Sequence, residues 1–210
     1  MAEITVVHLL RHGEVHNPDH VLYGRLPGYH LSANGRMMAA AAADYFEGRP
    51  VAAIFASPLE RAQETAQPVA ERLGLGIVTD DRLIESGNVL EGKSVSLASL
   101  ALNPLNWRYL WNPFQPSWGE PYTKIVARVR AAADQARDVS RGREAICVSH
   151  QLPIWVSRLA AEHRPLWHNP SSRQCALGSV TSLTFTDDQL TGVSYAVPPR
   201  QQVADADRAQ

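Results

Sequence analysis

The sequence has few cysteines and no excess of charge of either sign. Its 210 residues include only 2 cysteines, and Lys plus Arg number 20 against 21 for Asp plus Glu. A formal net charge of −1 provides no general basic field, which argues against a nucleic acid as a partner. Any site for an anion must therefore be local. Cys147 and Cys175 are expected to be structural and reduced.

Long apolar runs are also missing. No stretch of the sequence reaches the length that a membrane-spanning helix needs. The opening residues MAEITVVHLL carry an acid where a signal peptide carries basic residues. We therefore expect a cytoplasmic protein with no membrane partner.

Short β-rich runs alternate along the chain with longer alanine-rich segments of helical period. This alternation is typical of an α/β fold. The predicted strands are residues 4–10, 51–56, 76–79, 144–149, 179–185 and 193–197.

Three segments between these strands are predicted to be helices. Ser32 is placed to cap the first, and Pro58 is placed as the first residue of the second, which continues through Arg61. Pro68 is expected to kink or split that second helix. Residues 122–140 carry apolar side chains at helical spacing and form the third.

Two other segments lack this regular alternation. Residues 97–121 contain four prolines and three tryptophans, which indicates an insertion of short helices and turns, since disordered linkers are poor in aromatic residues. We expect a single domain over residues 1–197 with a lid-like insertion at about 93–121. Residues 198–210 lack apolar periodicity and are expected to form a disordered tail.

Charged side chains follow three of the predicted strands. Arg11 and His12 follow the first strand, Arg61 follows the second, and His150 follows the strand at 144–149. Ligands of α/β sheets bind outside the carboxyl ends of the strands. Each residue alone could be an ordinary surface or core residue, but two arginines and two histidines at strand ends together favour an anion site.

Four segments carry a resemblance to a known family. The first, LRHGE at residues 10–14, resembles the RHG signature of the histidine phosphatase superfamily, also called the phosphoglycerate mutase-like family. The others, in the family's order, are SPLERAQET at 57–65, RLIESGNVLEG at 82–92 and VSH at 148–150 followed by Pro153 and Ile154. The resemblance covers roughly residues 4–185. It implies a three-layer sandwich with a mostly parallel central sheet flanked by helices, and an activity that needs no metal or other cofactor.

The resemblance also implies a role for each charged residue. His12 is the expected nucleophile, because a neutral imidazole nitrogen can attack phosphorus and form a phosphohistidine. Arg11 and Arg61 can offer charge-assisted, forked hydrogen bonds to the phosphoryl oxygens. His150 is the second histidine of the pocket and is expected to be protonated and to donate to the same oxygens.

The leaving alcohol needs a proton donor. By resemblance this acid is Glu85, and Glu91 is the alternative, although Glu91 with Gly92 better fits the family's structural Glu-Gly element. A carboxylic acid near the phosphoryl group can protonate the leaving oxygen and later accept a proton from the attacking water.

The sequence departs from the family pattern at three positions. Val15 stands where the family often has threonine or serine, and Asn17 follows His12 by five residues instead of six. Gln151 stands where glycine usually follows the second histidine. We still predict that Asn17 and Gln151 bind phosphate or substrate.

The loop after Asn17 offers further candidates. Arg25 is a candidate substrate contact, with an ordinary surface arginine as the alternative. His16 and His20 are spaced like metal ligands, but no cysteine or acidic partner is placed to complete a site. No metal is expected.

Three functions compete at this stage. The favoured one is a phosphatase that hydrolyses small organic phosphomonoesters, so that the expected partner is a small phosphorylated metabolite. The runner-up is a phosphoglycerate mutase, but residues 93–121 have only Lys93 and Arg108 as cations, where the mutases carry a more basic stretch. A non-catalytic phosphate-binding module is the third, and it predicts the loss of at least one catalytic residue, whereas all are present.

Overall fold

The computed structural model describes residues 2–87, 91 and 119–199. Most of the predicted insertion at 93–121 and of the predicted tail at 198–210 lies outside these residues. Within the described ranges, no helix is both long and apolar enough to cross a lipid bilayer.

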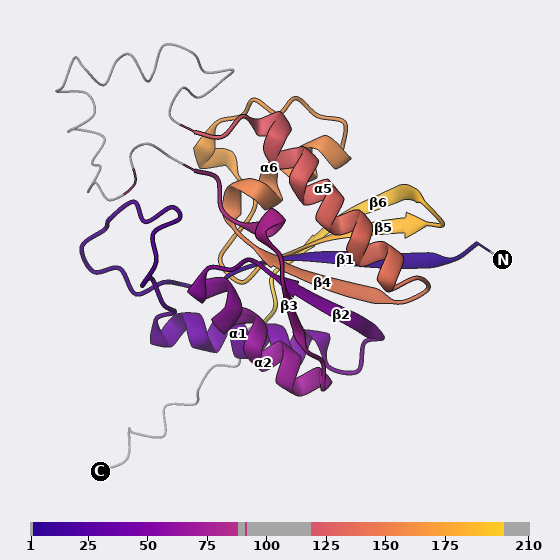
Figure 1. Ribbon diagram of the computed structural model, residues 1–210, viewed down its shortest axis with the longest axis horizontal. Coiled ribbons are helices and arrows are strands. Elements are labelled where there is room, and N and C mark those ends of the chain that lie inside the picture. Colours follow the sequence, from indigo (N-terminus) through magenta and orange to yellow (C-terminus); the bar gives the residue numbers. More distant parts are fainter. Residues whose placement is uncertain (1, 88–90, 92–118, 200–210) are drawn as a thin grey trace.

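Six strands form one sheet in the order β3-β2-β4-β1-β5-β6 (Figure 1). Their bounds are β1 (Ile4–Arg11), β2 (Val51–Ala56), β3 (Ile77–Thr79), β4 (Glu144–Ser149), β5 (Val180–Thr186) and β6 (Gln189–Ala196). The pairings of β3 with β2, β2 with β4 and β4 with β1 are parallel, while β5 and β6 join antiparallel. The prediction of a mostly parallel central sheet is confirmed.

Helices cover both faces of this sheet (Figure 1). The helices α1 (Ala33–Phe46) and α2 (Glu60–Leu73) lie on one face, and α5 (Tyr122–Val139) and α6 (Gln151–Ala161) on the other. Two short 3-10 helices, η1 (Asp81–Leu83) and η3 (Pro170–Ser172), lie in the connections. The predicted three-layer α/β architecture is therefore confirmed.

The central strands are buried on both faces. On β1, Leu9 packs in the core on the α5 side and Leu10 in the core on the α1–α2 side. On β4, Cys147 packs in the core on the α5 side and Val148 in the core on the α1–α2 side. Successive strand residues point to opposite faces, so a parallel strand covered by helices on both sides is apolar without interruption. Burial raises the pKa of the Cys147 thiol to about 12, which keeps this free cysteine neutral.

Two predicted helix features and the start of β6 differ most from the structure, while the bounds of β1, β3 and β5 differ by one residue. The second helix begins at Glu60 with Leu59 as its N-cap, because the first helical hydrogen bonds are accepted by the Leu59 carbonyl. Pro68 does not split this helix; buried neighbours on the same helix, such as Val69, hold it against the sheet. β6 begins at Gln189, four residues before its predicted start, since this exposed edge strand carries little apolar patterning.

Candidate functional site

The ends of β1, β2 and β4 bring the charged segments of the sequence together. Arg11, the last residue of β1, lies in register with Ser149, the last residue of β4. The His12 backbone N–H donates to the Ser149 carbonyl (3.1 Å), and the Ser57 N–H donates to the Val148 carbonyl (2.9 Å). The chain thus leaves three adjacent parallel strands at one edge of the sheet, where ligands of such sheets bind.

His12 is buried, with 2 % of its surface exposed, and its ring is held in one orientation. Its Nδ1 lies 2.7 Å from the Gly13 carbonyl oxygen. A carbonyl can only accept, so Nδ1 carries the proton and Nε2 keeps its lone pair. Burial, followed by the nearby charges of Arg61 and Arg11, lowers the pKa of His12 well below its ordinary value. His12 is therefore a neutral imidazole with a free ring nitrogen.

His150 lies beside His12, with ring centroids 5.1 Å apart. Its Nε2 is 2.7 Å from the Ser57 hydroxyl oxygen, while its buried Nδ1 has no hydrogen-bond partner in the described part of the chain. Burial, followed by His12 and Arg61, lowers the pKa of His150 well below its ordinary value. Burial and the positive charges of the site both disfavour a charged imidazole here, and the expected protonation of His150 beside a phosphoryl group stays a prediction.

Two arginines, the buried Arg61 and the half-buried Arg11, lie next to the histidines. Arg61 is completely buried and donates through Nη2 to the Gly24 carbonyl (2.6 Å), with its guanidinium 4.8 Å from the Tyr23 ring centroid. Arg11 donates to the Cys175 carbonyl. Within residues 2–87, 91 and 119–199, neither arginine forms an ion pair with a carboxylate. Buried charges are normally paired, so this pair of guanidinium groups is suited to an anion.

Glu85 brings a carboxyl group to the same place. Burial raises the pKa of this carboxyl, against the opposing effects of the Ser86 N–H bond and the charge of Arg61. Its segment is anchored because the Ser149 hydroxyl donates to the Leu83 carbonyl (2.7 Å). A buried acid with a raised pKa can hold a proton at a pH where ordinary carboxyls cannot.

Glu91, the alternative acid, also lies near the site. A Cβ placed on Gly24 would stand 2.3 Å from a Glu91 carboxylate oxygen, so this side chain packs against the loop that binds Arg61. Its charge also acts on Arg61. The structure therefore brings both acids to the site, and burial raises the pKa of Glu85.

The remaining predicted contacts take different positions. The Asn17 amide donates to the Val21 carbonyl (2.9 Å) and accepts from the Val21 N–H (3.0 Å), so it closes a turn of the loop. Arg25 donates to the Glu85 carbonyl (2.6 Å) and to the Glu120 carboxylate (3.0 Å). The structure thus ties Arg25 to the Glu85 segment and Asn17 to its own loop. In the described ranges, no three histidine, cysteine or acidic side chains gather as metal ligands.

Arg173 is a site residue that the sequence analysis missed. It precedes β5, and its Nε donates to Nε2 of His168 (2.9 Å) while Nη1 lies 3.4 Å from the Gln151 side-chain oxygen. Burial lowers its pKa, and the charges of Glu85 and Arg11 also act on it. Arg173 is therefore a third cation beside Glu85. No motif or strand end in the sequence marks this position.

The comparisons with known proteins agree with this architecture. The sequence profile of the histidine phosphatase superfamily (branch 1) matches residues 7–198. The uncharacterized protein Rv0525 of Mycobacterium tuberculosis is 54% identical over 199 residues, which cover 94% of this chain and 98% of that protein. The probable phosphoglycerate mutase GpmB of Escherichia coli is 31% identical, over 72% of this chain and 78% of its own.

A solved structure extends the likeness to three dimensions. The mycobacterial glucosyl-3-phosphoglycerate phosphatase Rv2419c matches with a TM-score of 0.74 at 26% identity. The match covers 94% of this chain and 98% of that one. The fold and the sequence profile thus agree over nearly the whole chain.

Proposed function

The chain belongs to the histidine phosphatase superfamily, and from this premise we propose that it hydrolyses small organic phosphomonoesters through a phosphohistidine on His12. One observation carries the proposal. His12 is a buried, neutral imidazole whose Nδ1 is fixed by the Gly13 carbonyl. The buried Arg61 and the half-buried Arg11 stand beside it, without carboxylate ion pairs in the described part of the chain. Such a group is a suitable nucleophile toward a bound phosphoryl dianion.

In the first half-reaction, Arg11 and Arg61 bind the phosphoryl oxygens, where charge develops in the transition state. Nε2 of His12 attacks phosphorus, a P–N bond forms, and the P–O bond to the substrate's alcohol breaks. The Glu85 carboxyl, whose pKa is raised by burial, gives its proton to the leaving oxygen. The products of this half-reaction are the alcohol and the phosphohistidine.

In the second half-reaction, water attacks the phosphohistidine. Glu85, now a carboxylate, takes a proton from this water, and inorganic phosphate leaves with the P–N bond broken. His150 assists through Nδ1, which is buried without a partner in the described part of the chain. A bound phosphoryl dianion raises the pKa of a neighbouring imidazole, so His150 becomes a proton-bearing donor to the phosphoryl oxygens when the substrate is present.

The leaving group meets the cations that surround Glu85. Arg25 lies on the Glu85 backbone, and Arg173 lies close to the Glu85 carboxyl. The Gln151 side-chain oxygen accepts a hydrogen bond from Arg173, so Gln151 also lies where the leaving group would be bound. We assign substrate contacts to Arg25, Arg173 and Gln151, and Asn17 remains a predicted phosphate ligand.

Phosphoglycerate mutase activity is the second candidate, because the likeness to the probable mutase GpmB of Escherichia coli favours it. In a mutase the phosphohistidine returns its phosphoryl group to a different hydroxyl of the bound glycerate. The similarity in structure to a glucosyl-3-phosphoglycerate phosphatase over 94% of the chain favours hydrolysis. The two differ in the final acceptor, which is water or an alcohol.

The test of the phosphatase is a screen of the full chain against sugar phosphates, nucleotides and phosphoglycerates, with release of inorganic phosphate as the readout. A parallel reaction with 3-phosphoglycerate and 2,3-bisphosphoglycerate measures 2-phosphoglycerate. Release of phosphate without 2-phosphoglycerate supports the proposal. Formation of 2-phosphoglycerate as the main product would replace it with the mutase.

The His12→Ala variant tests the nucleophile. We expect loss of turnover and of acid-labile phosphate labelling of the protein, because Nε2 of His12 is the proposed attacking atom, while Nε2 of the neighbouring His150 is hydrogen-bonded to the Ser57 hydroxyl (2.7 Å). The matched control is His163→Ala, since His163 is exposed and stands outside the site. Retained turnover in His12→Ala would contradict the proposed role of His12.

A further inference from the structure

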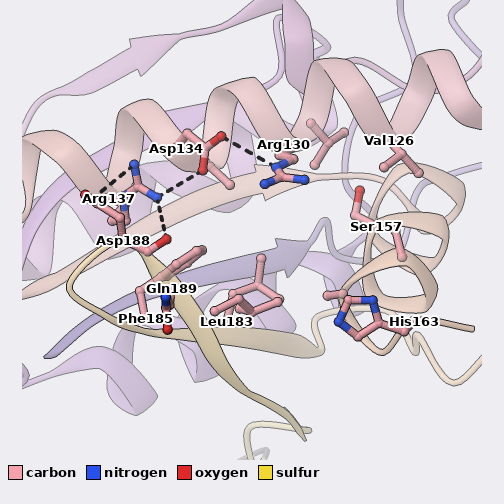
Figure 2. A pocket seen from close by; sticks show the side chains of 15 residues that line it. Val126, Arg130, Asp134, Arg137, Ser157, His163, Leu183, Phe185, Asp188 and Gln189 are labelled. Carbon is pink, nitrogen blue, oxygen red and sulfur yellow. Dashed lines mark hydrogen bonds and ion pairs between the residues drawn. The ribbon is translucent and has the colours of Figure 1, made fainter.

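A cavity lies on the face of the sheet that carries α5 and α6, away from the proposed catalytic residues (Figure 2). It has a volume of about 490 Å³ and is enclosed by α5, α6 and the β5–β6 hairpin. None of the proposed catalytic residues lines it. A cavity of this volume falls within the range of small-molecule sites, about 300–1,000 Å³. The proposed phosphatase chemistry leaves it unexplained.

The walls of this cavity are mainly apolar. Val129 and Ala133 of α5 face it from one side, and Leu183 and Phe185 of β5 form its floor. Leu190 of the hairpin lines the edge and is 36% exposed. An apolar ligand body would remove this surface from water, which is the main favourable contribution to such binding.

Ser157 places a polar group inside the apolar cavity. The residue is 8% exposed, and its hydroxyl has no hydrogen-bond partner among the described residues. Figure 2 shows this hydroxyl directed from α6 toward α5. Buried polar groups in proteins are normally hydrogen-bonded. The Ser157 hydroxyl is therefore suited to bind a polar group of a ligand.

Arg130 supplies a charge at the same cavity. Its side chain is 80% exposed, and its ion pair with Asp134 is long, at 3.8 Å. Asp134 also pairs with Arg137 (3.3 Å). Arg137 is in turn held by Asp138 and Asp188. Of the two arginines that line the cavity, Arg130 is thus the one with the weaker pairing.

From these observations we propose that the cavity binds a small amphipathic carboxylate. The Ser157 hydroxyl and the Arg130 guanidinium donate to the carboxylate, while the hydrocarbon body packs on the apolar floor. An amphipathic cation would meet the positive charge of Arg130, and a purely apolar ligand would leave the Ser157 hydroxyl without a partner. The charge and the polar group of this cavity together favour an anionic head.

The experiment measures binding by isothermal titration calorimetry on the full chain, with decanoate as the probe and decylammonium as its cationic counterpart. We expect saturable binding of one decanoate per chain and about threefold weaker binding of decylammonium, because water screens the charge of the exposed Arg130 and the Ser157 hydroxyl adds one hydrogen bond to the carboxylate. The readout is independent of turnover, so it does not depend on the proposed phosphatase activity.

Three variants locate the ligand. Arg130→Glu should weaken decanoate binding and strengthen decylammonium binding, while the matched control Lys124→Glu, on the exposed side of the same helix, should change neither by more than about twofold. Ser157→Ala should weaken decanoate binding. Ala160→Trp, at a partly exposed position that lines the cavity, should abolish it. Circular dichroism verifies that each variant is folded.

Equal affinity for both probes, or decanoate binding that survives Ala160→Trp in the folded protein, would overturn the proposal. Light scattering tests whether a second copy of the chain, instead of a small ligand, occupies the cavity. A dimer that dissociates in Ala160→Trp would show that a second copy of the chain fills the cavity and would also overturn it.

Discussion

At the scale of single residues, the site combines guanidinium groups that are withdrawn from water with a lack of carboxylate ion pairs among the described residues. Arg49 and Arg82 pair with Glu144 (2.7 Å) and Asp80 (2.6 Å). Arg11 and Arg61, in contrast, donate to backbone carbonyls. Arg36 and Arg143 also donate only to backbone carbonyls, but both are exposed to water. A carbonyl satisfies a hydrogen-bond donor but leaves the charge without a counter-charge. In the proposed reaction, an anionic substrate supplies that missing charge.

The raised pKa of Glu85 leads to a prediction about pH. The carboxyl must be protonated to act as the acid, so kcat/KM for an alkyl phosphate should fall as pH rises through this raised pKa. His12 does not limit activity on the acid side until well below its ordinary pKa of 6.5, since its pKa is lowered. The measurement is the steady-state kcat/KM of an alkyl phosphate as a function of pH, from below pH 6.5 to above the point at which activity declines.

The variant Glu85→Gln identifies the group responsible. It should lower kcat/KM for the alkyl phosphate by about 10²–10⁴-fold and remove the alkaline decline. The loss for 4-nitrophenyl phosphate should be much smaller, because its leaving oxygen needs little protonation. Glu91→Gln is the matched comparison. A larger, leaving-group-dependent loss in Glu91→Gln would assign the acid to Glu91 instead.

At the scale of elements, the loop that follows His12 is fixed by its contact with the start of α1. Ser32 and Asn34 donate to the Glu14 carboxylate (2.6 and 2.8 Å), and Ser32 also caps the helix through the Gly35 N–H (2.9 Å). A Cβ on Gly35 would stand 2.0 Å from the Glu14 carbonyl oxygen. The two backbones can therefore approach this closely only because a glycine stands at position 35.

Gly35→Ala should consequently damage both stability and activity. The added methyl group meets backbone atoms, which cannot move aside like a flexible side chain, so we expect a loss of about 1–3 kcal/mol in the free energy of unfolding. Displacement of the adjoining loop should also lower kcat/KM. Gly76→Ala is the matched control, because a Cβ there meets nothing within 4 Å. Urea unfolding and phosphatase kinetics test both, and equal stability of the two variants would contradict this account.

At the scale of the whole molecule, three buried histidines are held neutral. His8 contacts the Ser182 hydroxyl (2.8 Å) and the Glu144 carboxylate (3.0 Å), yet burial lowers its pKa. Burial is also the largest cause of the lowered pKa of His12 and His150. The core thus contains three imidazoles that bind protons more weakly in the folded chain than in the unfolded chain.

Acid should therefore destabilise the protein before its carboxylates titrate. Below about pH 6.5 the unfolded chain protonates these histidines while the folded chain does not, so the free energy of unfolding falls by about 1.4 kcal/mol per pH unit for each histidine. Glu85, with its raised pKa, and His30, whose pKa its bond to Glu64 raises, act in the opposite direction. Urea unfolding at pH 7.5 and 5.5 measures the net fall.

The His8→Gln variant separates one histidine from the other two. His8 lies outside the proposed catalytic site, so the variant should reduce the dependence of unfolding on pH by about one proton without altering the catalytic groups. An unchanged or steeper dependence would mean that His8 is not held neutral in the folded chain.

Much of the fold could be predicted from the sequence because its signals are local. The strands at 51–56 and 144–149 have the predicted bounds, since uninterrupted apolar runs mark strands that are buried on both faces. β6 was predicted four residues too short at its start, because an exposed edge strand has no such pattern. Of the two effects expected of Pro68, a split is excluded, since α2 runs as one helix from Glu60 to Leu73, while a kink stays a prediction.

The sequence by itself determined the family, the order of elements and the positions of Arg11, His12, Arg61, Glu85 and His150, because each lies in a short motif or directly after a strand. Only the tertiary structure decided the charge states and neighbours of these groups. The loss of water around them lowers the pKa of both histidines and raises that of Glu85. The tertiary structure also brought Arg173 beside Glu85 and formed the cavity between α5, α6 and the β5–β6 hairpin. Burial and contacts between distant segments arise only when the chain is packed.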